Sequence, residues 1–299
     1  MSKKKLSKSK FGYYFIAPFF IAFLVFQLYP IIYSLVMSFM KWDGMASEMT
    51  FIGLDNYKRL IADETFRKTI SNTWIIWIGS VIPQMVCALL LAVVLNKKKL
   101  KGKGIYRGIF YLPNLVTAAS IGVLFSFIFG WQSGTLNRLL IEMNIIKEPI
   151  NWLMGVGYSR GIISFANWWM WFGYSMIIFM AGMNTIPEEL HESSTIDGAS
   201  AWQDFWYITF PLLRPTILYS TITSLIGGMQ IFDIPNVLTR GNGGPMNSTL
   251  TMVMYLYNTA FKNYNYGYGA AIGYGLFVLI LIFSIISFKF INRKGDMYE

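Results

Sequence analysis

The sequence predicts an all-α protein that crosses a membrane several times. The chain is 55% hydrophobic and only 13% charged, whereas a soluble domain carries roughly 25% charged residues. The charged residues are also clustered. Six predominantly apolar stretches contain no Asp, Glu, Lys or Arg: 11–40, 69–96, 108–137, 161–187, 215–232 and 263–288.

Each stretch is a candidate transmembrane helix. Crossing a bilayer takes about 20 mostly apolar residues, in a helix that satisfies its own backbone hydrogen bonds. Five of the six stretches exceed that length, and 215–232 reaches it only if its helix carries Asp233 into the membrane. We therefore predict six crossings.

The first stretch, 11–40, follows a basic tail at 1–10 and is predicted to be an uncleaved transmembrane helix, followed by an extracytoplasmic loop at 41–68. A secretory signal has an apolar region of only about 7–15 residues before a small-residue cleavage site. The run 11–40 contains no such site. The charge-free segment 241–261 is not counted as a crossing. It begins with Gly, Pro and Asn, and its remainder, 250–261, is short enough for a surface helix or hairpin.

Basic residues indicate the orientation, because Lys and Arg in short loops mark the cytoplasmic side. They concentrate in three segments: Lys3, Lys4, Lys5, Lys8 and Lys10; Lys97, Lys98, Lys99, Lys101, Lys103 and Arg107; Lys289, Arg293 and Lys294. With six crossings these segments share one side, so both tails, 1–10 and 291–299, are predicted to be cytoplasmic. The net charge of +10 then reflects topology in a lipid bilayer, and no nucleic-acid partner is expected.

The sequence lacks the residues that several functional classes require. The single Cys87 and single His191 cannot build a disulfide or a multi-histidine metal site. The sequence contains no G-x-x-x-x-G-K-[ST] phosphate loop, so no ATP, cofactor or metal is expected to bind this chain. A membrane-embedded enzyme would need clustered ionisable residues, and Asp233 stands alone. No catalytic residues are predicted.

The segment 184–215 is an unusual cytoplasmic loop. It contains five acidic residues against the single Arg214: Glu188, Glu189, Glu192, Asp197 and Asp204. A helix is predicted from Pro187 to about Thr195, followed by a turn at Gly198 with positive φ. A second helix is predicted to start near Ala199 and to stop before Pro211. Its apolar side chains make a docking surface, although a connector lying on the membrane is the alternative.

This loop resembles the EAA loop of ABC importer permeases. The resemblance is carried by Glu192, Gly198 and the run Ile208-Thr-Phe-Pro211, with Ser193 and Ser194 in place of the usual Ala-Ala and Phe210 in place of Leu. It implies a type-I transmembrane domain over 69–290, whose loop helices seat in a cleft of an ATPase subunit. Carried over by position, the coupling residues are Glu192, Ser193, Ser194, Asp197, Gly198, Ala199, Phe205 and Pro211.

A second resemblance concerns the solute. The segment from Ile231 to Phe261, with Leu-Thr before Gly-Gly-Pro and a following Ser-Thr, resembles permeases of the maltose and oligosaccharide branch, as does Gly53-Leu-Asp-Asn-Tyr57. The two resemblances imply import of a sugar, with an oligosaccharide favoured. They also imply a second homologous permease, two ATPase subunits that bind ATP and Mg, and an extracytoplasmic sugar-binding protein.

The predicted solute pathway combines polar and aromatic residues. Gln230, Asp233 and Asn236 are spaced to share one helix face, and polar groups at membrane depth usually line a cavity. In the resembling permeases this part of the fifth helix lines the sugar site. Tyr174, Trp171 and Phe232 are the aromatic candidates. The alternatives are an interfacial belt for the tryptophans and a headgroup position for Asp233.

Two other functions stay open. A permease for glycerol phosphate would need Arg or Lys in the pathway, and the candidate face has neither. An ion-coupled secondary transporter would need its own ion site and usually shows internal repeats, and the sequence shows neither.

Overall fold

The computed structural model describes residues 3–45, 48–97 and 100–292, with side chains described from residue 12 to residue 289. The fold is all-α, as predicted, with one pair of two-residue strands among the described residues. Some of the predicted basic residues fall outside this description. The side chains of Lys3, Lys4, Lys5, Lys8 and Lys10 are not described, and Lys98, Lys99, Arg293 and Lys294 lie outside the described residues.

The chain divides into two compact units, unit 1 from residues 1–63 and 256–275 and unit 2 from residues 64–255 and 276–299. Unit 1 contains α1 (Lys3–Phe23), a π turn (Leu24–Leu28), α2 (Tyr29–Ser38), β1 (Met40–Lys41), β2 (Thr50–Phe51), α3 (Asp55–Ala62) and a second π turn (Asn258–Lys262). Unit 2 contains α4 (Glu64–Asn96), α5 (Lys103–Tyr111), α6 (Ala118–Ile128), α7 (Thr135–Glu142), α8 (Val156–Met183), α9 (Glu188–Ile196), α10 (Ala201–Asp204), α11 (Phe210–Leu212), α12 (Arg214–Met229) and α13 (Asp233–Leu238). Helices α14 (Met252–Tyr257) and α15 (Tyr266–Asn292) contribute residues to both units.

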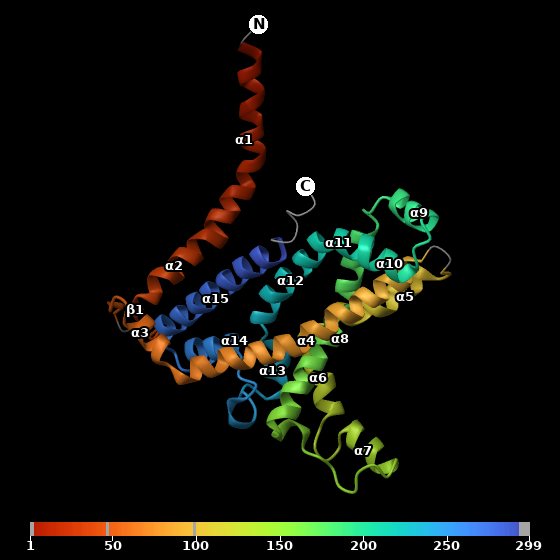
Figure 1. The fold of residues 1–299 in the computed structure, drawn as a ribbon. Helices are drawn as coiled ribbons and strands as arrows, with labels where there is room; N and C mark the ends of the chain where they lie inside the picture. Colours follow the sequence, from red (N-terminus) through yellow and green to blue (C-terminus); the bar gives the residue numbers. More distant parts are fainter. Residues whose placement is uncertain (1–2, 46–47, 98–99, 293–299) are drawn as a thin grey trace. The chain divides into compact units, whose positions relative to one another are not determined.

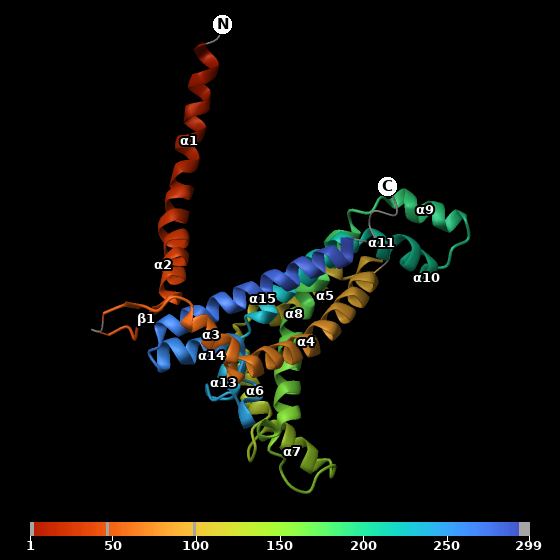
Figure 2. The same ribbon diagram turned by 60° about the vertical axis from the view of Figure 1, so that its left-hand side comes forward.

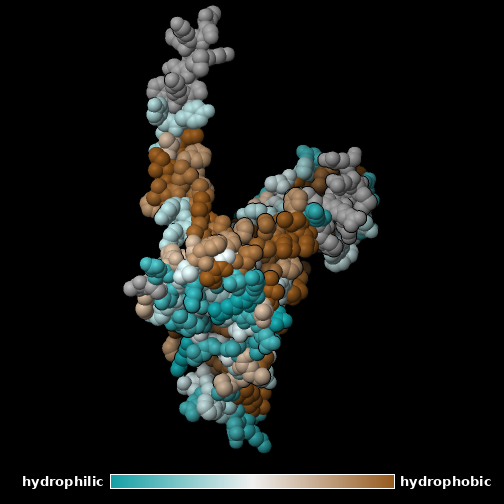
Figure 3. Space-filling view, turned by 90° about the vertical axis from the view of Figure 1, so that its left-hand side faces the viewer, coloured by the Kyte–Doolittle hydropathy of each residue, from teal (hydrophilic) through white to brown (hydrophobic). Residues whose placement is uncertain are grey.

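Unit 1 begins with a continuous helix made of α1, the π turn and α2. Pro30 lacks the N–H that an α-helix needs at this point, and the preceding turn widens so that the Tyr29 N–H donates to the Leu24 carbonyl. The candidate span Gly12–Ser38 buries none of its apolar window inside this chain. Figure 3 shows the resulting hydrophobic band, in brown, along this helix.

The rest of unit 1 is held together by polar contacts around a short hairpin. Strands β1 and β2 pair antiparallel, with Met40 opposite Phe51. The fully buried Tyr268 donates its hydroxyl to Asp63 at 2.5 Å, and the Arg59 guanidinium lies 3.9 Å from the centre of its ring. The Asn56 amide donates to the Met40 carbonyl at 2.9 Å and ties α3 to β1.

In unit 2, α4 and α8 lie side by side (Figures 1 and 2). Their facing residues Ile76, Ile163 and Ala166 are fully buried in one apolar cluster, and Ala88, Ala92 and Met176 are fully buried in another. Helices α9 and α10 lie at one end of the unit, and α7 lies at the other.

Five helices of the described chain are long and apolar enough to cross a membrane, and a bent helix pair makes a sixth if it counts as one span. The bent pair overlaps the third predicted stretch but starts before it, at Lys103, and the segment Lys103–Leu115 meets α6 at 90°. Pro113 removes a helix donor. Thr117 then starts the next helix by accepting a hydrogen bond from the Ser120 N–H.

Helix α8 begins at Val156 and includes Arg160, which the charge-free criterion excluded from the fourth crossing. The guanidinium is tolerated there because it is paired. It donates to the side-chain oxygen of Asn72 at 2.7 Å and to the Ser248 carbonyl at 2.9 Å.

The candidate span Arg214–Leu238 is interrupted between α12 and α13. Pro235 has no N–H to offer the carbonyl of Ile231, four residues earlier. That carbonyl accepts the Thr251 hydroxyl at 2.7 Å instead. The prediction that Gln230, Asp233 and Asn236 share one face of a continuous helix is therefore wrong.

The segment 241–261 is helical in its second half, which confirms a helix as the correct one of the two predicted forms. Helix α14 buries Met252 and Met254 completely. The Met252 N–H donates to the Thr73 hydroxyl at 3.1 Å, which connects the start of α14 to α4.

Candidate functional site

A pocket in unit 2 lies between α4, α8 and α12, and its volume is about 280 Å³. Aromatic and polar side chains dominate its lining, and none of the described lining residues is Asp, Glu, Lys, Arg or His. The lining consists of Trp77, Ser80, Gln84, Asn167, Trp171, Tyr174, Ser175, Ser220, Thr223, Ser224, Gly227, Gly228 and Ile231.

Helical periodicity places these residues together. On α12, Ser220, Thr223, Ser224 and Gly227 follow the i, i+3, i+4, i+7 pattern of one helix face. Helices α4 and α8 present their lining residues at similar spacings: 77, 80 and 84 on α4, and 167, 171, 174 and 175 on α8. Each of the three helices therefore turns one semi-polar face toward the same space.

Two amides offer hydrogen-bonding capacity to a ligand. The Gln84 amide nitrogen donates to the Ser175 hydroxyl at 2.8 Å, and the Asn167 amide nitrogen donates to the Ile163 carbonyl at 2.9 Å. These bonds leave the two amide oxygens without a hydrogen-bond partner among the described residues. Both amides are nearly buried, with 6% and 8% of their surfaces exposed, so their orientations are fixed before a ligand binds.

Trp77 forms a firm aromatic wall of the pocket. Its indole N–H donates to the Ser224 carbonyl at 2.9 Å. The ring lies directly against Gly228, where a Cβ atom would stand 2.5 Å from the indole nitrogen. On the α8 side, Trp171 and Tyr174 pack edge to face with ring centroids 5.8 Å apart. Sugar rings stack on surfaces of this kind.

Two of the six predicted pathway residues, Trp171 and Tyr174, line this pocket. Gln230, Phe232, Asp233 and Asn236 do not, because the helix ends at Met229 and only the neighbouring Ile231 reaches the lining. The sequence reasoning missed Gln84, Asn167 and the hydroxyl residues. Their signal was available as polar side chains repeating at helical spacing inside otherwise apolar stretches.

The predicted coupling loop forms a helix pair at one end of unit 2 (Figure 1). Helix α9 ends at a turn in which Gly198 has φ +79°, as predicted. The second helix starts at Ala201 after a capping box, in which Ser200 and Gln203 bond each other's backbone N–H groups. It does not stop before Pro211. In a π turn at Phe205–Thr209, the Phe210 N–H donates to the Phe205 carbonyl, five residues earlier. This wider turn accommodates Pro211, which has no N–H to donate, and the helix continues.

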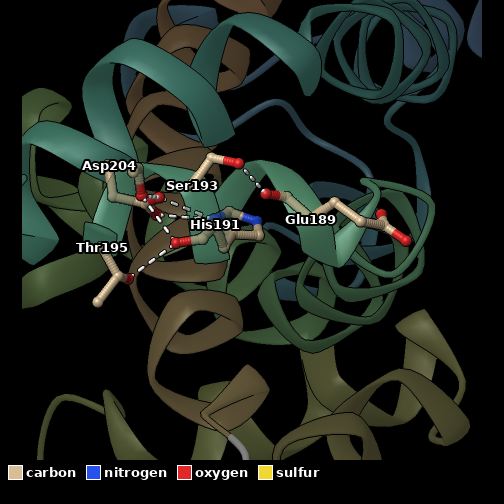
Figure 4. Close-up of polar contacts among 6 residues, drawn as sticks. Glu189, His191, Ser193, Thr195 and Asp204 are labelled. Atoms are coloured by element: carbon tan, nitrogen blue, oxygen red, sulfur yellow. Dashed lines mark hydrogen bonds and ion pairs between the residues drawn. The ribbon is translucent and has the colours of Figure 1, made fainter. Parts of the chain in front are cut away.

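One acidic residue joins the two helices of this loop. Asp204 on α10 contacts the His191 ring nitrogen Nδ1 at 2.9 Å and accepts the Ser194 hydroxyl at 2.8 Å (Figure 4). Ser194 is buried, whereas Ser193 is exposed and bonds only the Glu189 carbonyl of its own helix. The departure from Ala-Ala at these positions therefore gives this loop an additional inter-helix bond.

The outer surface of the helix pair is apolar with acidic groups between the apolar side chains. Ile196, Trp202 and Tyr207 expose 85%, 70% and 79% of their surfaces. Glu192, Asp197 and the two glutamates of the first turn, Glu188 and Glu189, are also exposed. Phe205 and Pro211 are partly buried at the back of the pair, and Ala199 is half-buried at the turn. Large exposed apolar side chains outside a membrane span mark a protein–protein contact.

Residues 73–294 match the family model described as the binding-protein-dependent transport system inner membrane component. The chain is 39% identical over 251 residues to the lactose transport system permease protein LacF of Rhizobium radiobacter, covering 84% of this chain and 83% of LacF. It is 37% identical over 284 residues to the arabinooligosaccharides transport system permease protein AraP of Bacillus subtilis (strain 168), covering 95% and 89%. In a crystal structure of a bacterial alginate ABC transporter in complex with an alginate pentasaccharide-bound periplasmic protein, one chain superposes with a TM-score of 0.81 at 22% identity, covering 97% of this chain and 96% of that one.

Proposed function

Because this chain belongs to the family of binding-protein-dependent transport system inner membrane components and is a permease subunit of an ABC importer, we propose that it forms part of the import pathway for a neutral oligosaccharide. The family consists of transport subunits, not enzymes. The type-I importer fold expected from the EAA loop is confirmed by the alginate transporter chain.

The uncharged pocket between α4, α8 and α12 is the observation that supports a neutral sugar. Its aromatic walls, fixed amides and hydroxyl groups suit sugar rings and sugar hydroxyls. Glycerol phosphate would require a cationic partner, and the described lining has none. The volume of about 280 Å³ lies just below the range for ligand pockets, roughly 300–1,000 Å³. A pocket of this size fits one subunit's share of a pathway between two permeases.

We further propose that the helix pair α9–α10 is the surface on which an ATPase subunit docks. Two ATPase subunits would bind ATP and Mg, so this chain needs no cofactor. A second homologous permease would complete the pathway, and an extracytoplasmic sugar-binding protein would deliver the solute. The first-helix tail and the C-terminal tail then lie in the cytoplasm of a multi-pass cell-membrane protein, on the same side as α9. An ion-coupled transporter would leave the exposed apolar and acidic surface of this helix pair without a role.

Purification of the tagged chain from its native membrane in mild detergent tests this proposal. We expect an ATPase and a second permease to copurify, and both to be lost on Gly198→Asp. The recovered complex, reconstituted into liposomes with its binding protein and ATP, is then offered radiolabelled lactose, arabinotriose and glycerol 3-phosphate. Uptake of a neutral sugar supports the proposal. A chain that purifies without an ATPase, or imports only glycerol 3-phosphate, overturns it.

A further inference from the structure

The Gly-Gly-Pro segment noted in the sequence forms a strained loop between α13 and α14, exposed at Met246 and Asn247 and buried from Ser248 to Thr251. Gly243 and Gly244 have φ of +73° and +67°, and the non-glycine residues Met246 and Asn247 have φ of +53° and +56°. Positive φ at non-glycine residues is unfavourable and persists only where the surroundings hold it. Contacts with residues outside the loop must therefore stabilise this conformation.

Asn72 on α4 fixes the loop through its side-chain amide. Its amide nitrogen donates to the carbonyls of Asn247, at 2.6 Å, and Leu250, at 3.0 Å. The side chain of Asn72 is completely buried. A buried carbonyl that has no hydrogen-bond donor destabilises the fold. The bond to the Leu250 carbonyl is buried and the bond to the Asn247 carbonyl is part-buried, so the two bonds favour this loop conformation.

Arg160 on α8 makes a further contact with the loop. Its Nε donates to the Ser248 carbonyl at 2.9 Å, and its Nη2 donates to the Asn72 side-chain oxygen at 2.7 Å. The Arg160 guanidinium thus orients the Asn72 amide and at the same time binds the loop at the Ser248 carbonyl. Helices α4 and α8 therefore each contribute one residue to this clamp.

Thr251, at the end of the loop, connects the clamp to the pocket. It is completely buried, and its hydroxyl donates to the Ile231 carbonyl at 2.7 Å. Ile231 lines the pocket and lies in the break between α12 and α13. The same carbonyl is the one that Pro235 leaves without a helical donor. The position of this pocket wall therefore depends on the loop.

We propose that Asn72, Arg160 and Thr251 are positioning residues for solute transport: they hold the loop so that the helix break and Ile231 form a fixed wall of the pocket. This inference rests on the proposed function, because it assigns the transported solute to that pocket. It gives the Gly-Gly-Pro and Ser-Thr segment a role in forming the pathway without contact with the solute.

The sharpest test compares Thr251→Val with Thr251→Ser. Valine matches threonine in shape but removes the hydroxyl, whereas serine keeps the hydroxyl and removes the methyl group. For Thr251→Val we expect the KM for uptake of the neutral sugar that wild type imports fastest to rise about tenfold. The variant leaves the Ile231 carbonyl without its donor and the Met254 N–H without its acceptor. The amount of complex and the maximal uptake rate stay near wild type. Thr251→Ser stays near wild type in all three quantities.

Asn72→Asp is the second variant. The carboxylate keeps the pairing with Arg160 but cannot donate to the two loop carbonyls, so we expect the same rise in KM. Hydrogen–deuterium exchange of the purified complex provides a readout that needs no sugar. The amides of residues 231–251 should exchange about tenfold faster in Thr251→Val than in Thr251→Ser.

An unchanged KM in Thr251→Val, or equal impairment of the serine variant, overturns the positioning role. A smaller amount of complex with a wild-type KM also overturns it, because a purely structural role changes only the amount. If Asn72→Asp does not accumulate in the membrane, the Thr251 pair decides alone. If wild type imports no sugar of the panel, the proposed function fails, while the exchange measurement still decides whether the clamp exists.

Discussion

The contact between Trp77 and Gly228 allows a pocket prediction to be worked out with a matched control. Gly228 and Gly227 are neighbours that both line the pocket. A Cβ atom at Gly228 would stand 2.5 Å from the indole nitrogen and 2.7 Å from Cγ of Trp77, with the ring's Cδ1 closer still. At Gly227 a Cβ atom would have no neighbour within 4 Å. Neither glycine has a positive φ, so both positions accept alanine in backbone terms.

Gly227→Ala should stabilise the protein slightly, because alanine favours a helix over glycine by about 0.5–1 kcal/mol. Gly228→Ala gains the same term but forces the indole aside, and overpacking of this kind destabilises a core by roughly 1–3 kcal/mol. The difference between the two variants isolates the clash, about 1–3 kcal/mol. The displaced ring also loses its bond to the Ser224 carbonyl, so uptake of a sugar should fall in Gly228→Ala.

Thermal unfolding followed by intrinsic tryptophan fluorescence, in one detergent, compares the two variants. We expect the Gly228→Ala midpoint to lie several degrees below that of Gly227→Ala, since about 1 kcal/mol shifts the midpoint of a chain of this size by roughly 2–4 °C. Equal unfolding midpoints and equal uptake in the two variants would refute the close packing of Trp77 against Gly228 of α12.

Three further predictions concern the loops. Ser194→Ala removes the buried hydroxyl that donates to a carboxylate on the next helix, and should lower the free energy of unfolding by about 1.5–3 kcal/mol, while the exposed Ser193→Ala should change the unfolding midpoint little. Gly198→Ala places a Cβ atom at φ +79°, which costs roughly 1–2 kcal/mol. ATPase recovery on purification should fall, and Gly157→Ala, with open space around it, is the control. Asn137 is 1% exposed, and the two N–H groups of its amide are shared among three carbonyls around α7, at 2.7, 2.8 and 3.2 Å. Asn137→Asp should therefore destabilise by more than about 3 kcal/mol, and proteolysis near residues 130–150 would report it.

Much of the coupling loop could be predicted from local sequence. Gly198 predicts a turn with positive φ, and Pro187 together with the glutamates that follow it predicts the start of a helix. The joint made by His191, Ser194 and Asp204 could not be predicted, because it brings together side chains of two separate helices. Pro211 misled the prediction for the same reason that proline usually ends a helix. A π turn can supply the compensating geometry, and the sequence does not show it.

The pocket shows the same difference between what local sequence predicts and what only packing reveals. Trp171 and Tyr174 were predicted because aromatic residues cluster visibly in one stretch of sequence. Gln84 and Asn167 were missed because each is a single polar residue in an apolar stretch, and only packing shows that they face the same space. The break after Met229 turned the remaining candidates away from the pocket.

The sequence by itself determined that this chain is a helical membrane protein, and it located the membrane stretches and the acidic loop. These properties depend on composition and on residues close together in the chain, and the bilayer enforces them on any long apolar helix. Tertiary structure alone decided where the helices break and which polar residues meet. The carbonyl that Pro235 leaves unpaired at Ile231 finds its donor in Thr251, twenty residues along the chain. A contact of that kind is set by the packing of whole helices, because hydrogen bonds buried in apolar surroundings must be completed wherever a donor can reach.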